Sequence, residues 1–274
     1  MKKLNKTLLT MAITASLGLA STSAMAFNEF TVQESGIAGA FANVFTMDKI
    51  NGTYLETVSI LGANTFSTSL RIKFQGFSNT NNGTDTTGQI GNVTSNQYGL
   101  YLLYTSVGTY AASGAGFEYT TTNAIFNLYS DSNSDTSFTA PAIPLAATLG
   151  SVNAYGRTGQ GEDQILATGN FISGSATQTC SGVTVNNNCG SFGQTTTFSL
   201  TAAGSQYFIA PTPFFDLSLQ SGNFNGFEPI AGQSQEISGV ANAIFQNSVP
   251  EPTSIALLGL GLLGLGMCRQ KQAK

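Results

Sequence analysis

The sequence predicts an all-β fold, an antiparallel β-sandwich or jelly-roll-like domain, and three observations support this. Short stretches of alternating apolar and polar residues recur at intervals of about ten residues, separated by turns rich in Gly, Asn and Ser. Phe, Tyr and β-branched residues recur throughout and are numerous enough to build a core. No helical periodicity of useful length occurs between the two ends of the chain.

The first predicted strand is the short alternating stretch that begins FTVQES. Asn51-Gly52 is a dipeptide typical of turns, so a turn is predicted there, followed by a strand over 54–60.

The clearest strand covers 66–74, where Phe, Leu and Ile alternate with polar residues, so that one face should be buried. Arg71 and Lys73 lie together on the other face. We interpret this face as solvated, and the alternative is a small contact for an anion.

The middle of the chain begins with a long polar loop, residues 78–97. The strand from Tyr98 to Tyr104 carries apolar residues on both faces, so we expect it to be central and its tyrosines to lie in the core. A hairpin is predicted next, from strands over 117–119 and 124–129. Residues 139–150 are interpreted as a connection within one domain, because no change in composition marks a linker. The remaining predicted strands cover 165–172, 195–201, 214–220 and 237–245.

The N-terminus has the pattern of a secretory signal peptide, residues 1–26. Three lysines precede an apolar run from Leu8 to Ala20, and Ala24 and Ala26 supply small residues at the spacing for cleavage. Such a peptide implies export through the Sec translocation machinery, and the mature domain would extend over 27–249.

The predicted mature domain is acidic. Only four of the 10 basic residues fall within 27–249, together with 13 of the 14 acidic residues, which gives a net charge of −9. The domain is therefore expected to bind neither nucleic acid nor anionic lipid. Its abundant hydroxyl and amide groups are typical of an exported β-protein whose surface binds polysaccharide or is inert.

Cys180 and Cys189 enclose the segment SGVTVNNN, whose Asn run favours a turn. We predict a local disulfide between them, as expected for an exported protein. The alternatives are a metal site, for which no further Cys or His ligand is present, and two free thiols. Cys268 lies in the C-terminal apolar segment and cannot join them.

Asp131, Asn133 and Asp135 have the spacing of the first ligands of a calcium loop. However, Thr136 stands where such a loop has glycine, and Ala142 where it has a closing glutamate. A polar turn is therefore preferred to this weak calcium candidate, and no metal or other cofactor is predicted. The adjacent acids Glu162-Asp163 are interpreted as an exposed turn.

The chain contains no His and no Trp. It thus lacks the commonest general base and metal ligand, and the largest aromatic platform for sugars. A hydrolase would depend on carboxylates alone, as glycosidases do, and Glu162-Asp163 is the only conspicuous pair. We therefore expect the protein not to be an enzyme.

The C-terminus has three parts in order: the motif Val249-Pro250-Glu251-Pro252, an apolar segment over 253–268, and a basic tail. The prolines keep the backbone extended and accessible, and the cations hold the tail on the cytoplasmic side of a membrane. As a helix the apolar segment would rise about 24 Å, less than the roughly 30 Å of a hydrocarbon core. This length suits a transient anchor better than a permanent one. The tail cations are Arg269, Lys271 and Lys274.

In motif, helix and tail, residues 250–274 resemble the PEP-CTERM sorting signal, although Arg269-Gln270-Lys271 stands where that family has a denser arginine cluster. The resemblance implies that a membrane protease, exosortase, processes the chain near Pro-Glu-Pro. The domain would then pass from an inner-membrane intermediate to the cell surface or extracellular matrix. An ordinary membrane anchor is the alternative.

Three stretches, FTVQES, DKINGTYLE and PFFDLSLQSGNFNGFEPI, resemble flocculation-associated, PepA-like PEP-CTERM proteins. This resemblance implies a non-catalytic matrix protein that associates with exopolysaccharide and contributes to floc and biofilm formation. Two alternatives stay open. One is a carbohydrate-binding module, in which a groove with exposed Tyr and Asn side chains, assisted by calcium, holds a glycan. The other is a glycosidase with two buried, facing carboxylates.

Overall fold

The computed structural model describes residues 27–62, 64–91, 98–179, 188–225 and 228–246. The predicted signal peptide, the Pro-Glu-Pro motif, the apolar segment and the basic tail lie outside these residues. Within them no helix is long and apolar enough to cross a membrane. The predicted all-β, antiparallel class is confirmed, because every pairing between strands is antiparallel.

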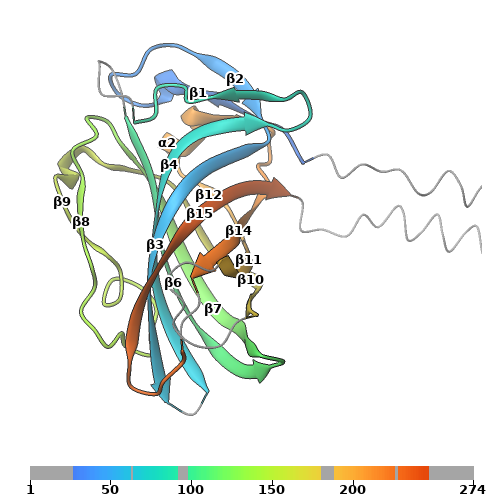
Figure 1. The fold of residues 1–274 in the computed structure, drawn as a ribbon. Helices are drawn as coiled ribbons and strands as arrows, with labels where there is room; N and C mark the ends of the chain where they lie inside the picture. The colour runs from blue at the N-terminus through green and yellow to red at the C-terminus, as the bar shows by residue number, and fades with distance from the viewer. Residues whose placement is uncertain (1–26, 63, 92–97, 180–187, 226–227, 247–274) are drawn as a thin grey trace, which may run out of the picture.

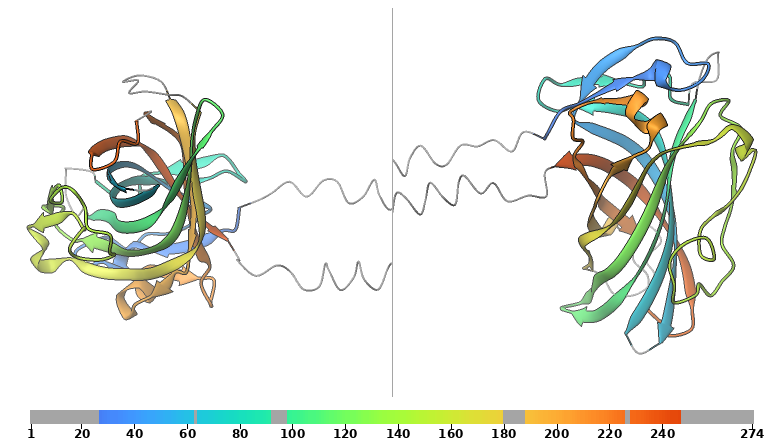
Figure 2. Two further views of the ribbon diagram at one scale, coloured as in Figure 1. Left: turned by 90° about the horizontal axis from the view of Figure 1, so that it is seen from below. Right: turned by 180° about the vertical axis from the view of Figure 1, so that it is seen from behind.

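Eight long strands form one sheet that closes into a barrel. Each strand pairs with the next one along the chain, the last pairs with the first, and the closing contacts are β10 with β11 and β15 with β3. Figure 1 shows these strands from the side, and the left panel of Figure 2 looks along the barrel. The strands are β3 (Lys49–Gly62), β4 (Thr65–Asn79), β6 (Gly99–Ser113), β7 (Gly116–Asp131), β10 (Gln164–Gln178), β11 (Asn188–Thr196), β14 (Asp216–Asn225) and β15 (Ser234–Gln246).

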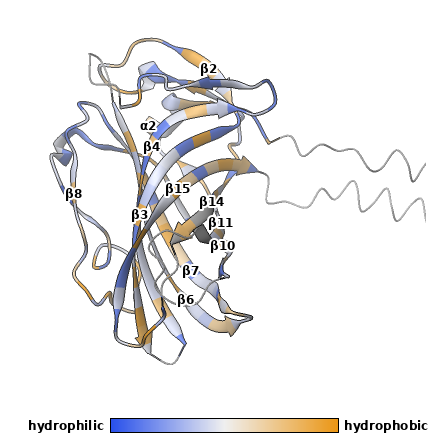
Figure 3. Ribbon diagram, viewed as in Figure 1, coloured by the Kyte–Doolittle hydropathy of each residue, from blue (hydrophilic) through white to orange (hydrophobic). Residues whose placement is uncertain are grey.

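Side chains alternate between the interior and the outer face of the barrel. On β4, Phe66, Leu70 and Ile72 are buried inside, as the alternation over 66–74 predicts. Figure 3 shows the resulting bands of hydrophobic and hydrophilic residues along the strands. The barrel therefore has its core inside the closed sheet rather than between two stacked sheets.

A cap covers one end of the barrel (Figure 1). It consists of a small sheet, β13-β1-β2, with a short helix and a 3-10 turn. Aromatic side chains fill the space beneath it, and the ring centroids of Phe30 and Phe245 are 4.8 Å apart. The two ends of the described chain thus meet at the capped end. The cap elements are β1 (Phe30–Gln33), η1 (Glu34–Gly36), β2 (Val44–Met47), α2 (Ala202–Tyr207) and β13 (Phe208–Ala210).

A strap, residues 132–163, connects β7 to β10 and lies against the outside of the barrel (Figure 1). It contains β8 (Ser137–Thr139), β9 (Gly156–Thr158) and η2 (Gln160–Glu162). Its Tyr155 packs against Tyr101, Leu103 and Tyr129 in a second, smaller core. The segment 139–150 accordingly belongs to a connection within one fold. Two very short strands, β5 (Thr84–Thr86) and β12 (Ser199–Leu200), complete the described elements.

Three local predictions are wrong. The stretch 195–201 is not one strand, because β11 ends at Thr196 and β12 covers only Ser199–Leu200. Asn51-Gly52 forms no turn: β3 runs through it, with a register shift at this point. A side chain at Gly52 would collide with the carbonyl oxygen of Lys73, so the glycine permits a close approach of two strands instead. Residues 117–129 form no hairpin, because the Thr-rich centre of this stretch continues one strand, β7, which pairs along its length with β6.

The outer face of β4 is not simply solvated. The guanidinium of Arg71 lies 5.1 Å from the ring centroid of Phe138, and the Nζ of Lys73 lies 5.0 Å from it. The sequence did not indicate that a strap covers this face. The prediction that the tyrosines from Tyr98 to Tyr104 lie in the core is confirmed, because Tyr98, Tyr101 and Tyr104 are buried and Tyr98 is fully inaccessible.

Candidate functional sites on the outer face and inside the barrel

An outer groove of about 320 Å³ lies between the strap and the outer faces of β6 and β7. Its volume is in the range of small-molecule sites. Side chains that suit sugar recognition line it: hydroxyl and amide groups, aromatic rings and one cation. These side chains are Thr105, Asn127, Tyr129, Ser151, Tyr155, Arg157 and Gln160.

Arg157 lies at the edge of the outer groove and connects the strap to the barrel. Its guanidinium lies 4.2 Å from the ring centroid of Tyr129, and Nη1 donates a hydrogen bond of 2.7 Å to the hydroxyl of Tyr101. Nη1 is also 3.4 Å from Oδ2 of Asp163, which accepts a hydrogen bond from Tyr101. These contacts hold the strap on the barrel and keep the Tyr129 ring in place.

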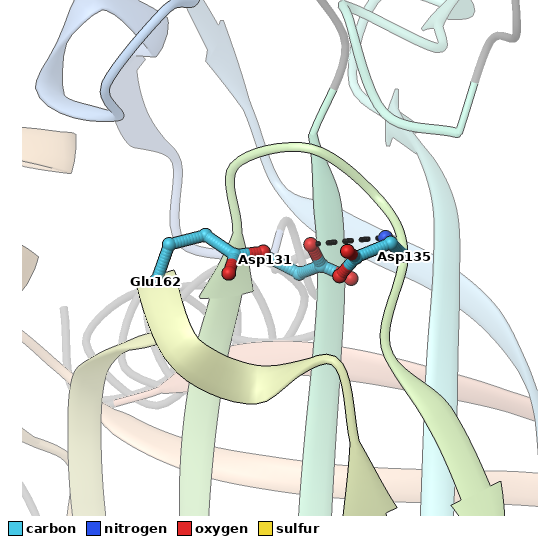
Figure 4. Close-up of side chains that lie close together, drawn as sticks. All are labelled: Asp131, Asp135 and Glu162. Carbon is cyan, nitrogen blue, oxygen red and sulfur yellow. Dashed lines mark hydrogen bonds between the residues drawn. The ribbon is translucent and has the colours of Figure 1, made fainter.

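An acidic cluster lies at the end of β7, two residues along the strand from Tyr129 of the outer groove. Figure 4 shows its three side chains. Asp131, Asp135 and Glu162 each place a carboxylate oxygen within 4.8 Å of the others. Asp131 accepts hydrogen bonds from the backbone amides of Asp135 at 3.3 Å and Thr136 at 2.9 Å, which fixes the turn. Desolvation raises the pKa of Glu162, and the negative charges of Asp135 and Asp131 raise it further.

The residues of the acidic cluster differ from those of the predicted calcium loop. Asn133 is not one of the converging groups: its Nδ2 donates to Oδ2 of Asp135 at 3.3 Å. Glu162, which we interpreted as part of an exposed turn, takes its place, because η2 brings it beside the loop after β7. With one oxygen from each carboxylate, the cluster supplies three of the six to eight oxygens that calcium takes. The arrangement fits a calcium site only if water or backbone carbonyls complete it.

The barrel interior contains a second candidate site, a cavity of about 50 Å³ to which all eight strands contribute. It lies in the half of the barrel away from the cap, near the β3–β4 and β6–β7 hairpins. One carboxylate, Glu56, faces it. The other polar groups form a belt on neighbouring strands: Thr68, Tyr104, Ser106, Thr121 and Gln194.

Hydrogen bonds connect this polar belt. Oγ1 of Thr68 and Oγ of Ser106 are 2.8 Å apart, the hydroxyl of Tyr104 donates to Oε1 of Gln194 at 3.2 Å, and Nε2 of Gln194 donates to Thr121 at 3.0 Å. Gln194 reaches the interior across Gly174 on β10, where any side chain would collide with the Gln194 amide. The glycine therefore makes the placement of this amide possible.

Burial raises the pKa of Glu56 to about 7, and a hydrogen bond from Thr68 lowers it only in part. Glu56 therefore changes its charge near neutral pH, unlike an ordinary surface glutamate. No motif in the sequence marks this residue. The alternation within the predicted strand over 54–60 contains the evidence, since it places Glu56 on the same face as Tyr54 and Val58.

A different carboxylate, Glu34, lies beneath the cap and is fully buried. Its two oxygens accept hydrogen bonds from the backbone amide of Gln89 at 2.6 Å, the Gln89 side chain at 2.7 Å, Asn43 at 2.9 Å and Tyr98 at 3.0 Å. The hydroxyls of Tyr98 and Tyr207 are 2.6 Å apart. The carboxylate is thus fully engaged by protein donors, so we regard the Glu34 network as structural.

The other predicted site residues lie mostly outside the described residues. These are Ala24 and Ala26, Val249 to Pro252, and Arg269, Lys271 and Lys274. Cys180 also lies outside, so its pairing with Cys189 stays a prediction. The register pairs Gln178 with Gly190, which places the chain just before Cys180 opposite the chain just after Cys189.

Comparison with known proteins identifies the C-terminal signal. Residues 248–270 match the family of the PEP-CTERM protein-sorting motif. No curated protein and no solved structure is significantly similar to the chain. The matched segment covers the Pro-Glu-Pro motif, the apolar segment and Arg269, and begins two residues after β15 ends. The chain is therefore an exported protein with a C-terminal membrane-anchor sorting signal, and exosortase is its processing partner.

Proposed function

We propose that the barrel domain is a non-catalytic protein of the extracellular matrix that associates with exopolysaccharide and contributes to floc and biofilm formation. The observation that carries this proposal is the sorting signal at residues 248–270. In the proposal, the Sec machinery exports the chain, exosortase cuts it near Pro-Glu-Pro, and the barrel passes to the cell surface or matrix.

The placement of the signal supports release of an intact domain. β15 is hydrogen-bonded to both β14 and β3 and ends at Gln246, four residues before Pro250. A cut near Pro250 would therefore remove no barrel strand. The first and last strands meet at the cap, so the domain would be tethered at one end only.

The distribution of carboxylates supports a non-catalytic role. No Asp or Glu lines the outer groove, and Glu56 is the only one that lines the inner cavity. Within the described residues, neither site thus offers the two facing carboxylates that glycosidases use.

The first experiment compares wild type with Glu251→Ala in the producing cells. We expect wild type to appear in the matrix without the residues beyond the Pro-Glu-Pro region, and Glu251→Ala to stay in the membrane with its full mass. Glu228→Ala, an exposed glutamate in the barrel domain, is the matched control and should be processed normally. If both wild type and Glu251→Ala keep the apolar tail, the segment is an ordinary anchor and the proposal fails.

The second experiment tests the matrix role itself. Cells that lack the protein should form fewer or weaker flocs, and the wild-type gene should restore them. The purified protein should associate with exopolysaccharide weakly and without saturation. Normal flocculation in cells without the protein would contradict this part of the proposal.

The outer groove favours a second candidate, a carbohydrate-binding module with a defined glycan site. Saturable binding to one purified glycan would support it, and Asn127→Ala combined with Gln160→Ala should weaken that binding at least about tenfold, since each lost hydrogen-bonding group contributes on the order of 1 kcal/mol. Asn123→Ala, an exposed position on the same strand, is the control. Calcium assistance predicts tighter binding with calcium than with a chelator.

A further inference from the structure

The inner cavity contains a carboxylate that the proposed function does not use. Glu56 occupies an inward position on β3, where the neighbouring inward residues Tyr54 and Val58 are largely apolar and buried. Glu56 itself is half-buried, and a carboxylate that has lost part of its water is unfavourable unless a partner compensates it. A compensating positive charge is therefore expected beside Glu56.

The chain offers no such cation among the described residues. Arg71 and Lys73 contact the strap on the outer face, and Arg157 pairs with Asp163 there. Lys49 begins β3 at the end opposite the cavity, where it pairs in register with Ser78. Glu56 accordingly faces the cavity with a hydroxyl partner, Thr68, but with no positive charge.

The walls of the cavity suit an organic cation. Aromatic side chains border it from several strands, and an ammonium group is attracted to the faces of such rings. Thr68, Ser106 and Gln194 add oxygens that accept N–H hydrogen bonds. The bordering aromatic residues are Phe66, Tyr104, Tyr119, Phe192 and Phe224.

The size of the cavity limits the ligand. A volume of about 50 Å³ corresponds to roughly three to five water-sized spheres of about 10–15 Å³ each. An ammonium group with one or two carbons fills such a space, whereas a sugar does not fit. An eight-stranded barrel is wide enough to be filled by side chains or to hold one small ligand.

We propose that the barrel interior is a binding site for a small primary alkylammonium ion, whose ammonium group pairs with the Glu56 carboxylate and whose carbons contact the surrounding aromatic rings. This site is separate from the outer groove and does not depend on the matrix function.

Binding is coupled to the charge of Glu56. Burial holds the pKa of this carboxyl near 7, so below neutral pH a bound cation must displace a proton. The other titratable groups near it are Tyr54 on β3, Tyr104 on β6 and Tyr119 on β7, and burial raises the pKa of each. These hydroxyls stay neutral throughout, so the proton that binding releases comes from Glu56.

Calorimetric titration with ethylammonium chloride tests the proposal, using exported protein purified from the producing cells. At about pH 8 we expect one site with a dissociation constant of about 1 mM or weaker, the range open to a ligand of so few atoms. Ethanol, the neutral counterpart of nearly the same shape, should bind at least about tenfold more weakly, because it cannot pair with the carboxylate. Saturable binding of ethylammonium is the supporting result. No saturable heat, or equal binding of ethanol, overturns the proposal.

Variants and proton release complete the test. Glu56→Gln should lose the binding at least about tenfold, whereas Glu236→Gln, an exposed carboxylate on the adjacent strand β15, should retain it. Titrations of wild type at about pH 6 in two buffers of different ionisation enthalpy should show proton release that disappears at about pH 8. This last measurement needs no variant. Unchanged affinity in folded Glu56→Gln, or no proton release at the lower pH, contradicts the assignment.

Discussion

Two carboxylates point into the domain and their surroundings differ: Glu34 is fully buried beneath the cap, and Glu56 is half-buried in the opposite half. Glu34 accepts four hydrogen bonds, from Gln89, Asn43 and Tyr98, in a region packed with aromatic rings. Glu56 borders a cavity and has a single hydroxyl partner. An inward position alone therefore does not decide what a carboxylate does. The number of donors around it separates a structural group from one that is available to a ligand and to protons.

The largest effect is expected from Glu34→Leu. The substitution leaves several buried donors without an acceptor, and we expect the free energy of unfolding to fall by about 4 kcal/mol. For a domain of this size the melting temperature should decrease by roughly 10 °C. Thermal unfolding followed by circular dichroism measures this, with Glu228→Leu as the exposed control. A loss as small as that of the control would show that the Glu34 network contributes little.

Unlike Glu34→Leu, Glu56→Gln should raise the free energy of unfolding, and the size of this gain should depend on pH. The folded-state pKa of Glu56 is raised from 4.5 to about 7, so the folded state binds a proton that the unfolded state has lost. The stabilisation by this proton is complete below about pH 4.5 and is lost as the pH rises to about 7, by at most about 3 kcal/mol. Glu56→Gln removes this loss.

Denaturant unfolding at about pH 4, 6 and 8 checks this result. Wild type and Glu236→Gln should show the same decline in stability between the lowest and highest pH, and Glu56→Gln a smaller one. Parallel curves for all three proteins would mean that Glu56 is ionised at ordinary pH and well solvated.

The disulfide prediction concerns the same half of the barrel, since Cys180 follows the end of β10 in the sequence and Cys189 is the second residue of β11. A cross-link here would stabilise the rim of the half that contains the cavity. We expect Cys189→Ser to reduce stability by about 2–3 kcal/mol, and the mass of wild type to rise by two hydrogens on reduction. Ser191→Ala, exposed on the same strand, is the control. Reaction of unreduced wild type with a thiol reagent at both cysteines would refute the bridge.

The sequence predicts the local features of this barrel better than its closure. The alternation over 66–74 marks a strand correctly, because side-chain direction in a strand is a property of neighbouring residues. Closure depends on pairings between distant segments, such as β3 with β15, and alternation says nothing about them. The same pattern is therefore compatible with a sandwich and with a barrel.

The candidate sites were predictable to different degrees. Glu56 stands out once the strand over 54–60 is assigned, because it is a charged residue on an apolar face. The outer groove depends on the strap, whose Tyr155 and Arg157 follow no periodic pattern. Likewise, Asp131 and Asp135 are close in sequence, but Glu162 joins them only through the path of the strap.

The smallest effect is expected at the acidic cluster, whose carboxylates lie on the outside of the barrel. The raised pKa of Glu162 means that its ionisation disfavours the folded state, so this cost is present at neutral pH and absent below about pH 4.5. Glu162→Gln should slightly raise the melting temperature at neutral pH in the presence of a chelator, and leave it unchanged at low pH. If calcium completes this cluster, the metal should instead raise the melting temperature of wild type but not of Glu162→Gln. If calcium raises the melting temperature of both proteins, the metal binds elsewhere. The cluster would then consist of two turns whose carboxylates repel each other.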